Sequence, residues 1–130
     1  MDIKSLHHVA YRCKDAKQTT EFYSKVLGLE YAMAMAEDRV PSTGEQSPYM
    51  HIFFRMDDGS YVAFFEVPDS PPMGRDQNTP LWVQHLALRV PDMKTLMAYK
   101  KKLAAVSRPM LKEWSKTKKA PHHTDWVHKK

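Results

Sequence analysis

The apolar and polar positions near the start of the chain predict a strand followed by a helix. Apolar and polar side chains alternate from Leu6 to Cys13, which is typical of a half-buried strand with one polar face. Asp15 is a suitable N-cap for a helix over 16–27, and Gln18 at its third position completes a capping box. Gly28 is the expected C-terminal cap.

Three further stretches have the composition of strands. They span Leu29–Met35, Tyr49–Met56 and Ser60–Val67, and the turn sequence Asp57-Asp58-Gly59 joins the last two. Residues 1–67 are therefore expected to form one βαβββ module of an α+β fold. The stretch 36–48 is rich in turn-forming residues, and we expect it to be a lid or an interface loop.

A second copy of the opening segment begins 77 residues further on. The sequence L-H-H-V-A-Y-R-C-K-D at 6–15 matches V-Q-H-L-A-L-R-V-P-D at 83–92, so that His8 corresponds to His85. A match at a fixed offset indicates a duplicated structural unit. The Pro-rich stretch 68–82 is then expected to be the linker between the two copies.

The second copy is predicted to be incomplete. Residues 83–105 repeat the strand and the helix, whereas the basic tail at 106–130 shows no clear strand alternation. At most one of the three strands that the repeat requires is expected in that tail. Because a half-built sheet exposes apolar surface, we expect a homodimer, in which the two copies can exchange modules.

Composition and charge narrow the class of protein. The chain has 130 residues, of which 42% are hydrophobic and 27% charged, as in an ordinary soluble globular protein, and we expect a cytoplasmic one. There is no apolar run that could cross a bilayer and no signal peptide. The net charge of +5 divides into −4 over 1–93 and +9 over 94–130, and we interpret the basic end as a solvated helix face rather than a nucleic-acid site. The single cysteine, Cys13, is expected to be a small buried hydrophobic residue.

The chemistry that the residues suggest centres on His8, His85 and Glu66. Glu66 ends an otherwise apolar strand, where a carboxylate is costly unless it is paired or bound to a cation. Two imidazoles and one carboxylate suit a divalent first-row metal with positions open to substrate. The alternative is that each histidine is a hydrogen-bonded structural residue, and the equivalence of His8 and His85 under the repeat favours the metal.

Four segments resemble the vicinal oxygen chelate superfamily, which includes glyoxalase I, methylmalonyl-CoA epimerase, extradiol dioxygenases and the bleomycin-resistance proteins. They are H-H-V-A-Y-R-C-K-D, E-F-Y-S-K-V-L-G-L, Y-V-A-F-F-E-V and Q-H-L-A-L-R-V-P-D, and the resemblance covers roughly residues 5–104. It implies paired βαβββ modules whose curved mixed sheets enclose a divalent metal such as iron, manganese, nickel or zinc. Its ligand layout carries over to His8 and Glu66 from the first module and His85 from the second.

Other site residues follow from the same resemblance. The fourth ligand of the layout, a glutamate late in the second module, has no counterpart here. Its possible replacements are His122, His123, Asp125 and His128. Glu66 would also be the base in proton-transfer chemistry. The residues themselves add weaker candidates for substrate binding. Arg12 and Arg89 could bind an anionic substrate, with a salt-bridged rim as the alternative, and Phe64 could line the cavity beside Glu66.

The resemblance implies a metal-dependent enzyme that acts on a small substrate with vicinal oxygens. The place of Glu66 in the first module favours a lyase or isomerase, and a dioxygenase is the other enzymatic alternative. Two alternatives without catalysis stay open. One is an inactive or remodelled member that serves as a binding or interaction protein, and the other is a metal-free binder of the bleomycin-resistance type.

Overall fold

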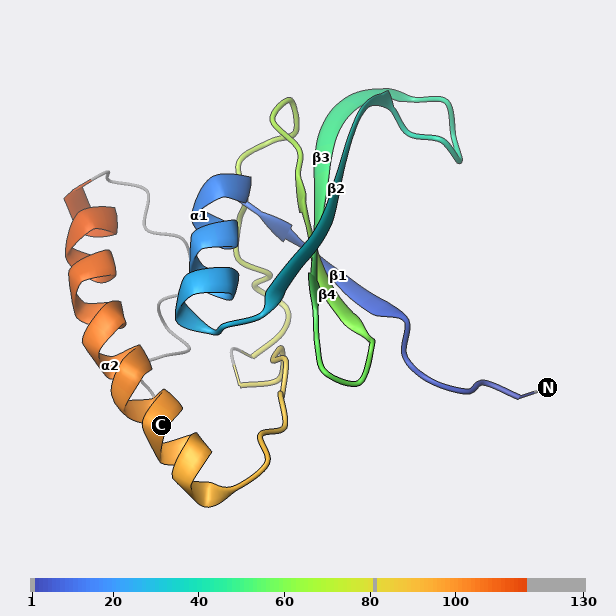
Figure 1. Ribbon diagram of the computed structural model, residues 1–130. Coiled ribbons are helices and arrows are strands. Elements are labelled where there is room, and N and C mark those ends of the chain that lie inside the picture. The colour runs from blue at the N-terminus through green and yellow to red at the C-terminus, as the bar shows by residue number, and fades with distance from the viewer. Residues whose placement is uncertain (1, 81, 117–130) are drawn as a thin grey trace. The chain divides into compact units, whose positions relative to one another are not determined.

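The computed structural model describes residues 2–80 and 82–116, and the chain divides into two compact units, Met1–Pro72 and Met73–Lys130. The first unit contains a mixed sheet and one helical segment, and the second contains one long helix (Figure 1). In the part of the chain that the structure describes, there is no helix both long and apolar enough to cross a membrane.

Four strands form the sheet of the first unit, one before the helical segment and three after it, in the predicted βαβββ order. They are β1 (His8–Cys13), β2 (Glu30–Arg39), β3 (Gln46–Arg55) and β4 (Tyr61–Glu66). Their order across the sheet is β1-β4-β3-β2, with β1 parallel to β4 and the other neighbours antiparallel. The sheet is curved and does not close on itself (Figure 1). The predicted α+β class with a curved mixed sheet is confirmed.

The prediction of a long loop over 36–48 is wrong, because β2 and β3 extend into this stretch. Arg39 pairs with Gln46, and the connection shrinks to 40–45, where Gly44 has a positive φ of 72°. The residues of β2 are all exposed, so this edge strand needs no apolar alternation. Pairing with β3 supplies its backbone hydrogen bonds, and the turn-forming composition misled the sequence argument.

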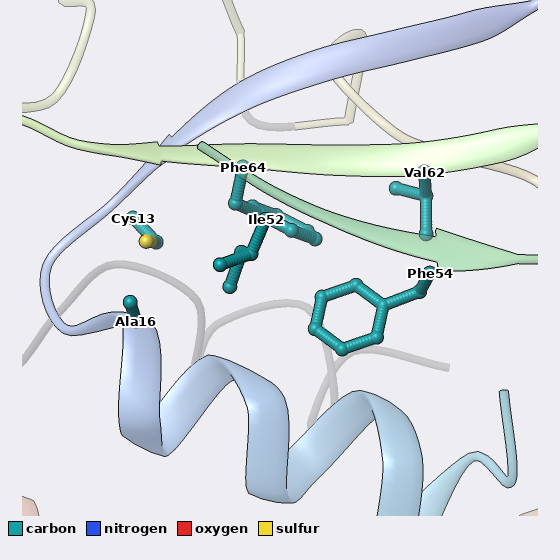
Figure 2. Packing of buried hydrophobic residues seen from close by; sticks show 6 residues of the cluster. All are labelled: Cys13, Ala16, Ile52, Phe54, Val62 and Phe64. Atoms are coloured by element: carbon teal, nitrogen blue, oxygen red, sulfur yellow. The ribbon is translucent and has the colours of Figure 1, made fainter. Parts of the chain in front are cut away.

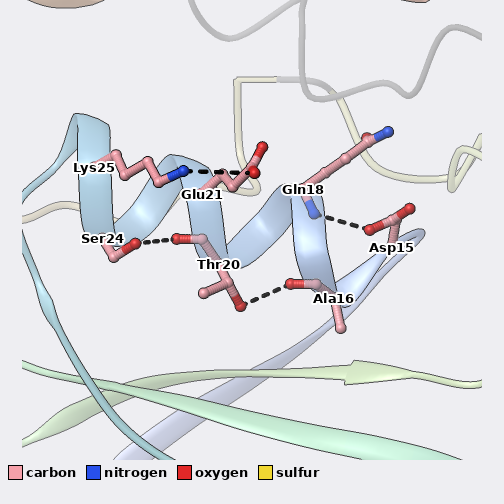
Figure 3. Close-up of polar contacts among 7 residues, drawn as sticks. All are labelled: Asp15, Ala16, Gln18, Thr20, Glu21, Ser24 and Lys25. Atoms are coloured by element: carbon pink, nitrogen blue, oxygen red, sulfur yellow. Dashed lines mark hydrogen bonds and ion pairs between the residues drawn. The ribbon is translucent and has the colours of Figure 1, made fainter.

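The helical segment begins and ends at the predicted caps. It consists of α1 (Ala16–Thr20), which continues as a π-helical turn, η1 (Glu21–Val26). Asp15 accepts a hydrogen bond from the Gln18 backbone N–H at 2.8 Å, which satisfies one of the free donors of the first turn (Figure 3). Gly28 follows the segment with a positive φ of 78°, as a glycine C-cap requires.

The core of the first unit lies between the sheet and this helical segment (Figure 2). The ring of Tyr23 stacks on Phe54 at 5.2 Å between centroids, and burial raises the pKa of Tyr23 to about 12. Cys13 is buried, as predicted, and burial raises the pKa of its thiol. The buried cluster consists of Cys13, Ala16, Ile52, Phe54, Val62 and Phe64.

The second unit differs from the predicted strand and helix. Its helix, α2 (Met93–Lys116), begins after Asp92, whose side chain accepts a hydrogen bond from the Thr95 backbone N–H at 2.7 Å. The strand predicted at 83–90 is wrong, since 85–90 have no regular secondary structure. A strand needs a neighbour to bond with, and the described residues of this unit form no strand. Instead, α2 continues past residue 105, where the sequence argument ended the helix.

Candidate functional site

The register of the strands sorts the candidate site residues onto two faces of the sheet. Residues directly opposite one another on neighbouring strands point to the same side, and successive residues alternate. His8 lies opposite Tyr61, and Phe65 lies opposite both Arg12 and His51. We call the side away from α1 the histidine face. By register it includes His8, Ala10, Arg12, Tyr49, His51, Phe53, Arg55, Tyr61, Ala63 and Phe65, and on β2 it includes Glu30, Met33, Met35 and Glu37.

The other side, which we call the helix face, carries Glu66. Glu66 lies opposite Cys13 and Met50 at the end of β4, whereas His8 pairs with Tyr61 at the start of that strand. The Oε2 atom of Glu66 accepts a hydrogen bond from the Ala16 backbone N–H at 2.6 Å. A carboxylate is favourable at the first turn of a helix, where backbone donors lack partners. The structure therefore does not bring Glu66 and His8 together.

The remaining predicted site residues lie in varied surroundings. Phe64 is only 2% exposed and packs in the core, where its ring lies 4.7 Å from that of Tyr23. Arg12 lies on the histidine face, and its Nη2 atom donates to the Pro71 carbonyl oxygen at 2.7 Å. His85 and Arg89 belong to the second unit and are both exposed. The tail candidates lie outside the described residues: His122, His123, Asp125 and His128.

His51 is a candidate that the sequence argument missed. Its imidazole lies 3.5 Å from the ring of Phe65 and 4.1 Å from that of Phe53, between centroids. The ring of His8 is 6.2 Å from His51 and 5.5 Å from Phe53. The signal that could have found His51 was a histidine within the apolar strand sequence M-H-I-F-F. His8 at the exposed start of β1 and the buried His51 thus form one histidine pair among aromatic rings.

The Nε2 atom of His51 is buried and has no hydrogen-bond partner, and the residue as a whole is 6% exposed. Burial disfavours the charged imidazolium and lowers the pKa of His51, and the nearby His8 lowers it further. His51 is therefore neutral at neutral pH. A neutral imidazole can donate or accept a hydrogen bond at Nε2, depending on its tautomer.

We expect the pKa of His51, measured by NMR titration of its imidazole signals, to lie below the usual value of about 6.5. His8→Gln should raise the pKa of His51 only part of the way, because burial is the larger cause. At a pH between the usual pKa and the lowered one, the unfolded chain binds more protons at this histidine than the folded chain does. The free energy of unfolding therefore decreases as the pH falls through this range. A pKa above the usual value would contradict the buried position of His51.

A cavity of about 370 Å³ lies near the end of β4, beside the long hairpin of β2 and β3. It contains the carboxylates of Glu37, Asp38 and Glu66, which would repel an anion. The complete lining is Ala36, Glu37, Asp38, Pro48, Tyr49, Met50, Glu66 and Pro68. Since it includes none of the histidines, this cavity is separate from the histidine pair.

The described side chains of the first unit do not form a complete metal site. Among the side chains that the structure describes, no three His, Cys, Asp or Glu residues are grouped so that they could hold a metal ion. By register, the carboxylates on the histidine face are Glu30 and Glu37, and both belong to β2, at the opposite edge of the sheet from His8. Because the described donors form no such group, we derive no catalytic step through a metal.

The sequence matches the model of a known protein family. A profile of the Glyoxalase/Bleomycin resistance protein/Dioxygenase superfamily matches residues 5–123. The chain belongs to this superfamily. Members of the superfamily typically use divalent metals, usually act on small molecules and often form dimers. The resemblance inferred from the four sequence segments is thereby confirmed.

One curated protein is similar to the chain in sequence, and one solved structure is similar to it in fold. The Bacillus subtilis (strain 168) protein "Putative ring-cleaving dioxygenase MhqA" is 29% identical over 106 residues, which are 78% of this chain and 30% of MhqA. The chain therefore spans under a third of the length of this relative. The crystal structure of SMU.1112c matches with a TM-score of 0.50 at 20% identity, over 81% of this chain and 76% of that one, and supports the fold alone.

Proposed function

We propose that this chain is a dioxygenase-type member of the superfamily that binds a small aromatic substrate with neighbouring oxygens on its histidine face. The observation that carries the proposal is the histidine pair, in which His8 and His51 lie among the rings of Phe53 and Phe65. Aromatic rings pack favourably against a flat substrate ring. Imidazole nitrogens beside them can hydrogen-bond to its oxygens. The similarity to MhqA, which is named for ring cleavage, supports the same substrate class.

The position of Glu66 favours a dioxygenase over a lyase or isomerase. Proton-transfer chemistry needs a base close to the substrate. Glu66 was the candidate for that base, but it bonds to the start of α1 on the opposite face from His8. A substrate on the histidine face would be out of its reach. The lyase or isomerase alternative therefore loses Glu66 as its base.

The proposal includes a divalent metal, with His8 and His85, the two histidines related by the repeat, as its ligands. Neutral imidazole nitrogens are suitable ligands for iron, manganese, nickel and zinc. The carboxylates of the histidine face, Glu30 and Glu37, lie on β2 at the other edge of the sheet from His8, so the register does not place either of them beside it. If the metal is absent, the same face supports the alternative function of a metal-free binding protein.

The test combines metal content with oxygen uptake. The full chain is reconstituted with Fe(II), and its metal content and its oxygen consumption with catechol are measured. We expect about one metal per chain and oxygen uptake with cleavage of the ring, both lost in His8→Ala and in His85→Ala. Glu21→Ala, at an exposed position of the helical segment, is the control and should retain both.

The opposite result would be clear. No bound metal after reconstitution with iron, manganese, nickel and zinc, together with no oxygen uptake, would overturn the enzymatic proposal. Binding of catechol by such a metal-free chain would then identify it as a binding protein.

A further inference from the structure

Two buried side-chain nitrogens in the described part of the chain have no hydrogen-bond partner, and both belong to the histidine face. They are Nε of Arg12 and Nε2 of His51. Buried polar groups are almost always hydrogen-bonded, because an unpaired one is costly. Two such groups on one face of one small sheet therefore suggest a ligand that satisfies both.

The strand register places these two residues in a single row. Arg12 on β1 lies opposite Phe65 on β4, and Phe65 lies opposite His51 on β3. Neighbouring strands are about 4.8 Å apart, so the Cα atoms of Arg12 and His51 are separated by about 10 Å, with Phe65 between them. An arginine and a histidine on the same side at this spacing can both reach one small group bound between them.

The remaining contacts of Arg12 hold its side chain in place. Its Nη2 atom donates to the carbonyl oxygen of Pro71 at 2.7 Å and is within 3.5 Å of those of Val67 and Ser70. These carbonyls occupy one end of the guanidinium and leave Nε–H without an acceptor. The guanidinium is always charged. The carboxylates of this face, Glu30 and Glu37, lie on β2 at the other edge of the sheet, and Glu30 pairs with Arg55.

The donors in the row define the chemistry of the missing partner. Arg12 Nε can only donate, and His51 donates in the tautomer with its proton on Nε2. Two donors, one of them cationic, bind most strongly to an oxygen acceptor that carries negative charge. The rings of Phe53 and Phe65, which contact His51, favour an aromatic group beside that oxygen, because aromatic rings pack well against one another.

We propose that the row Arg12–Phe65–His51 binds the anionic oxygen of an aromatic ligand, either a carboxylate or a phenolate. This inference rests on the proposed function in placing a substrate ring on the histidine face, and it adds the charge that the ligand carries. His8, at the exposed start of β1, then lies at the rim of the same site.

The test is an NMR titration of the full chain, without added metal, with benzoate as the probe. We expect saturable binding at millimolar concentrations or tighter, with shifts of the Arg12 Nε–H signal and of the His51 imidazole signals. Benzamide, which is neutral and has nearly the same shape, should bind at least about tenfold more weakly. 4-Nitrophenolate at alkaline pH replaces the carboxylate by a phenolate, and the tighter of the two anions identifies the preferred oxygen.

Variants separate a binding role from a purely structural one. His51→Phe keeps an aromatic ring between Phe53 and Phe65 and removes Nε2, and Arg12→Lys keeps the charge and removes Nε. Each should weaken benzoate binding by about tenfold or more. His51→Phe should fold at least as well as the native chain, because it removes a buried unpaired group, so the test does not depend on the Arg12 variant. Arg55→Lys is the matched control on the same face and should bind as the native chain does.

Unchanged benzoate affinity in His51→Phe, or benzamide binding as tightly as benzoate, would overturn the inference. So would the absence of benzoate binding. The test needs neither metal nor turnover, so its failure is distinguishable from failure of the proposed function. Benzoate binding by a chain that shows no oxygen uptake would support this site and contradict the dioxygenase proposal alone.

Discussion

Phe54→Ala is expected to lower the free energy of unfolding by about 3–5 kcal/mol, the usual cost of removing a buried phenylalanine ring. Phe54 is 0% exposed, and its ring lies 5.2 Å from that of Tyr23 and 6.1 Å from that of Phe64. It therefore links the sheet to the helical segment at the centre of the core. The loss is large because small domains are stable by only about 5–15 kcal/mol in total.

Urea denaturation followed by circular dichroism measures this loss. Met50→Ala is the matched control, since Met50 lies on the same helix face of β3 but is 41% exposed, and we expect it to cost much less. If Phe54→Ala does not fold, Phe54→Leu gives a smaller and measurable loss. Equal losses for the Phe54 and Met50 variants would contradict the position of the core between the sheet and α1.

Glu66→Ala is expected to lower the free energy of unfolding by about 1.5–3 kcal/mol, the usual worth of a hydrogen bond to a charged group. The change removes the acceptor of the Ala16 backbone N–H at the start of α1. Since Glu66 is only partly buried, we expect the lower end of this range. Glu66→Gln keeps an acceptor oxygen and removes the charge, and it should therefore cost less than Glu66→Ala.

Metal content separates this structural role from the ligand role predicted for Glu66. We expect Glu66→Gln to hold as much metal as the native chain after reconstitution, as measured by elemental analysis. Loss of the metal in Glu66→Gln, with no change in stability, would instead identify Glu66 as a ligand. That outcome would contradict the strand register that places Glu66 opposite Cys13.

The strands and caps of the first unit were predictable because they depend on local patterns. Alternation identified β1 and β4, and the caps Asp15 and Gly28 bounded the helical segment. The face on which Glu66 lies was not predictable in this way. Alternation sorts residues within one strand, but only the register between strands decides which faces coincide, and register depends on long-range pairing.

The candidate site was predictable only in part, for the same reason. His8 was visible through the repeat, whereas His51 belongs to no motif and gains its importance from its position across the sheet from Arg12. The strand predicted at 83–90 illustrates a related limit of local patterns. Its alternation resembles that of β1, but a strand forms only where a neighbour supplies hydrogen bonds.

The most direct test of the account is an NMR titration of the full chain with catechol, followed through assigned aromatic side-chain signals. If the histidine face binds the substrate ring, the signals of His8, His51, Phe53 and Phe65 shift together and saturate. Those of Phe54 and Phe64, on the helix face of the same strands, then stay nearly unchanged. Shifts confined to the helix face or to the acidic cavity beside Glu66, or no shifts at all, would contradict the account.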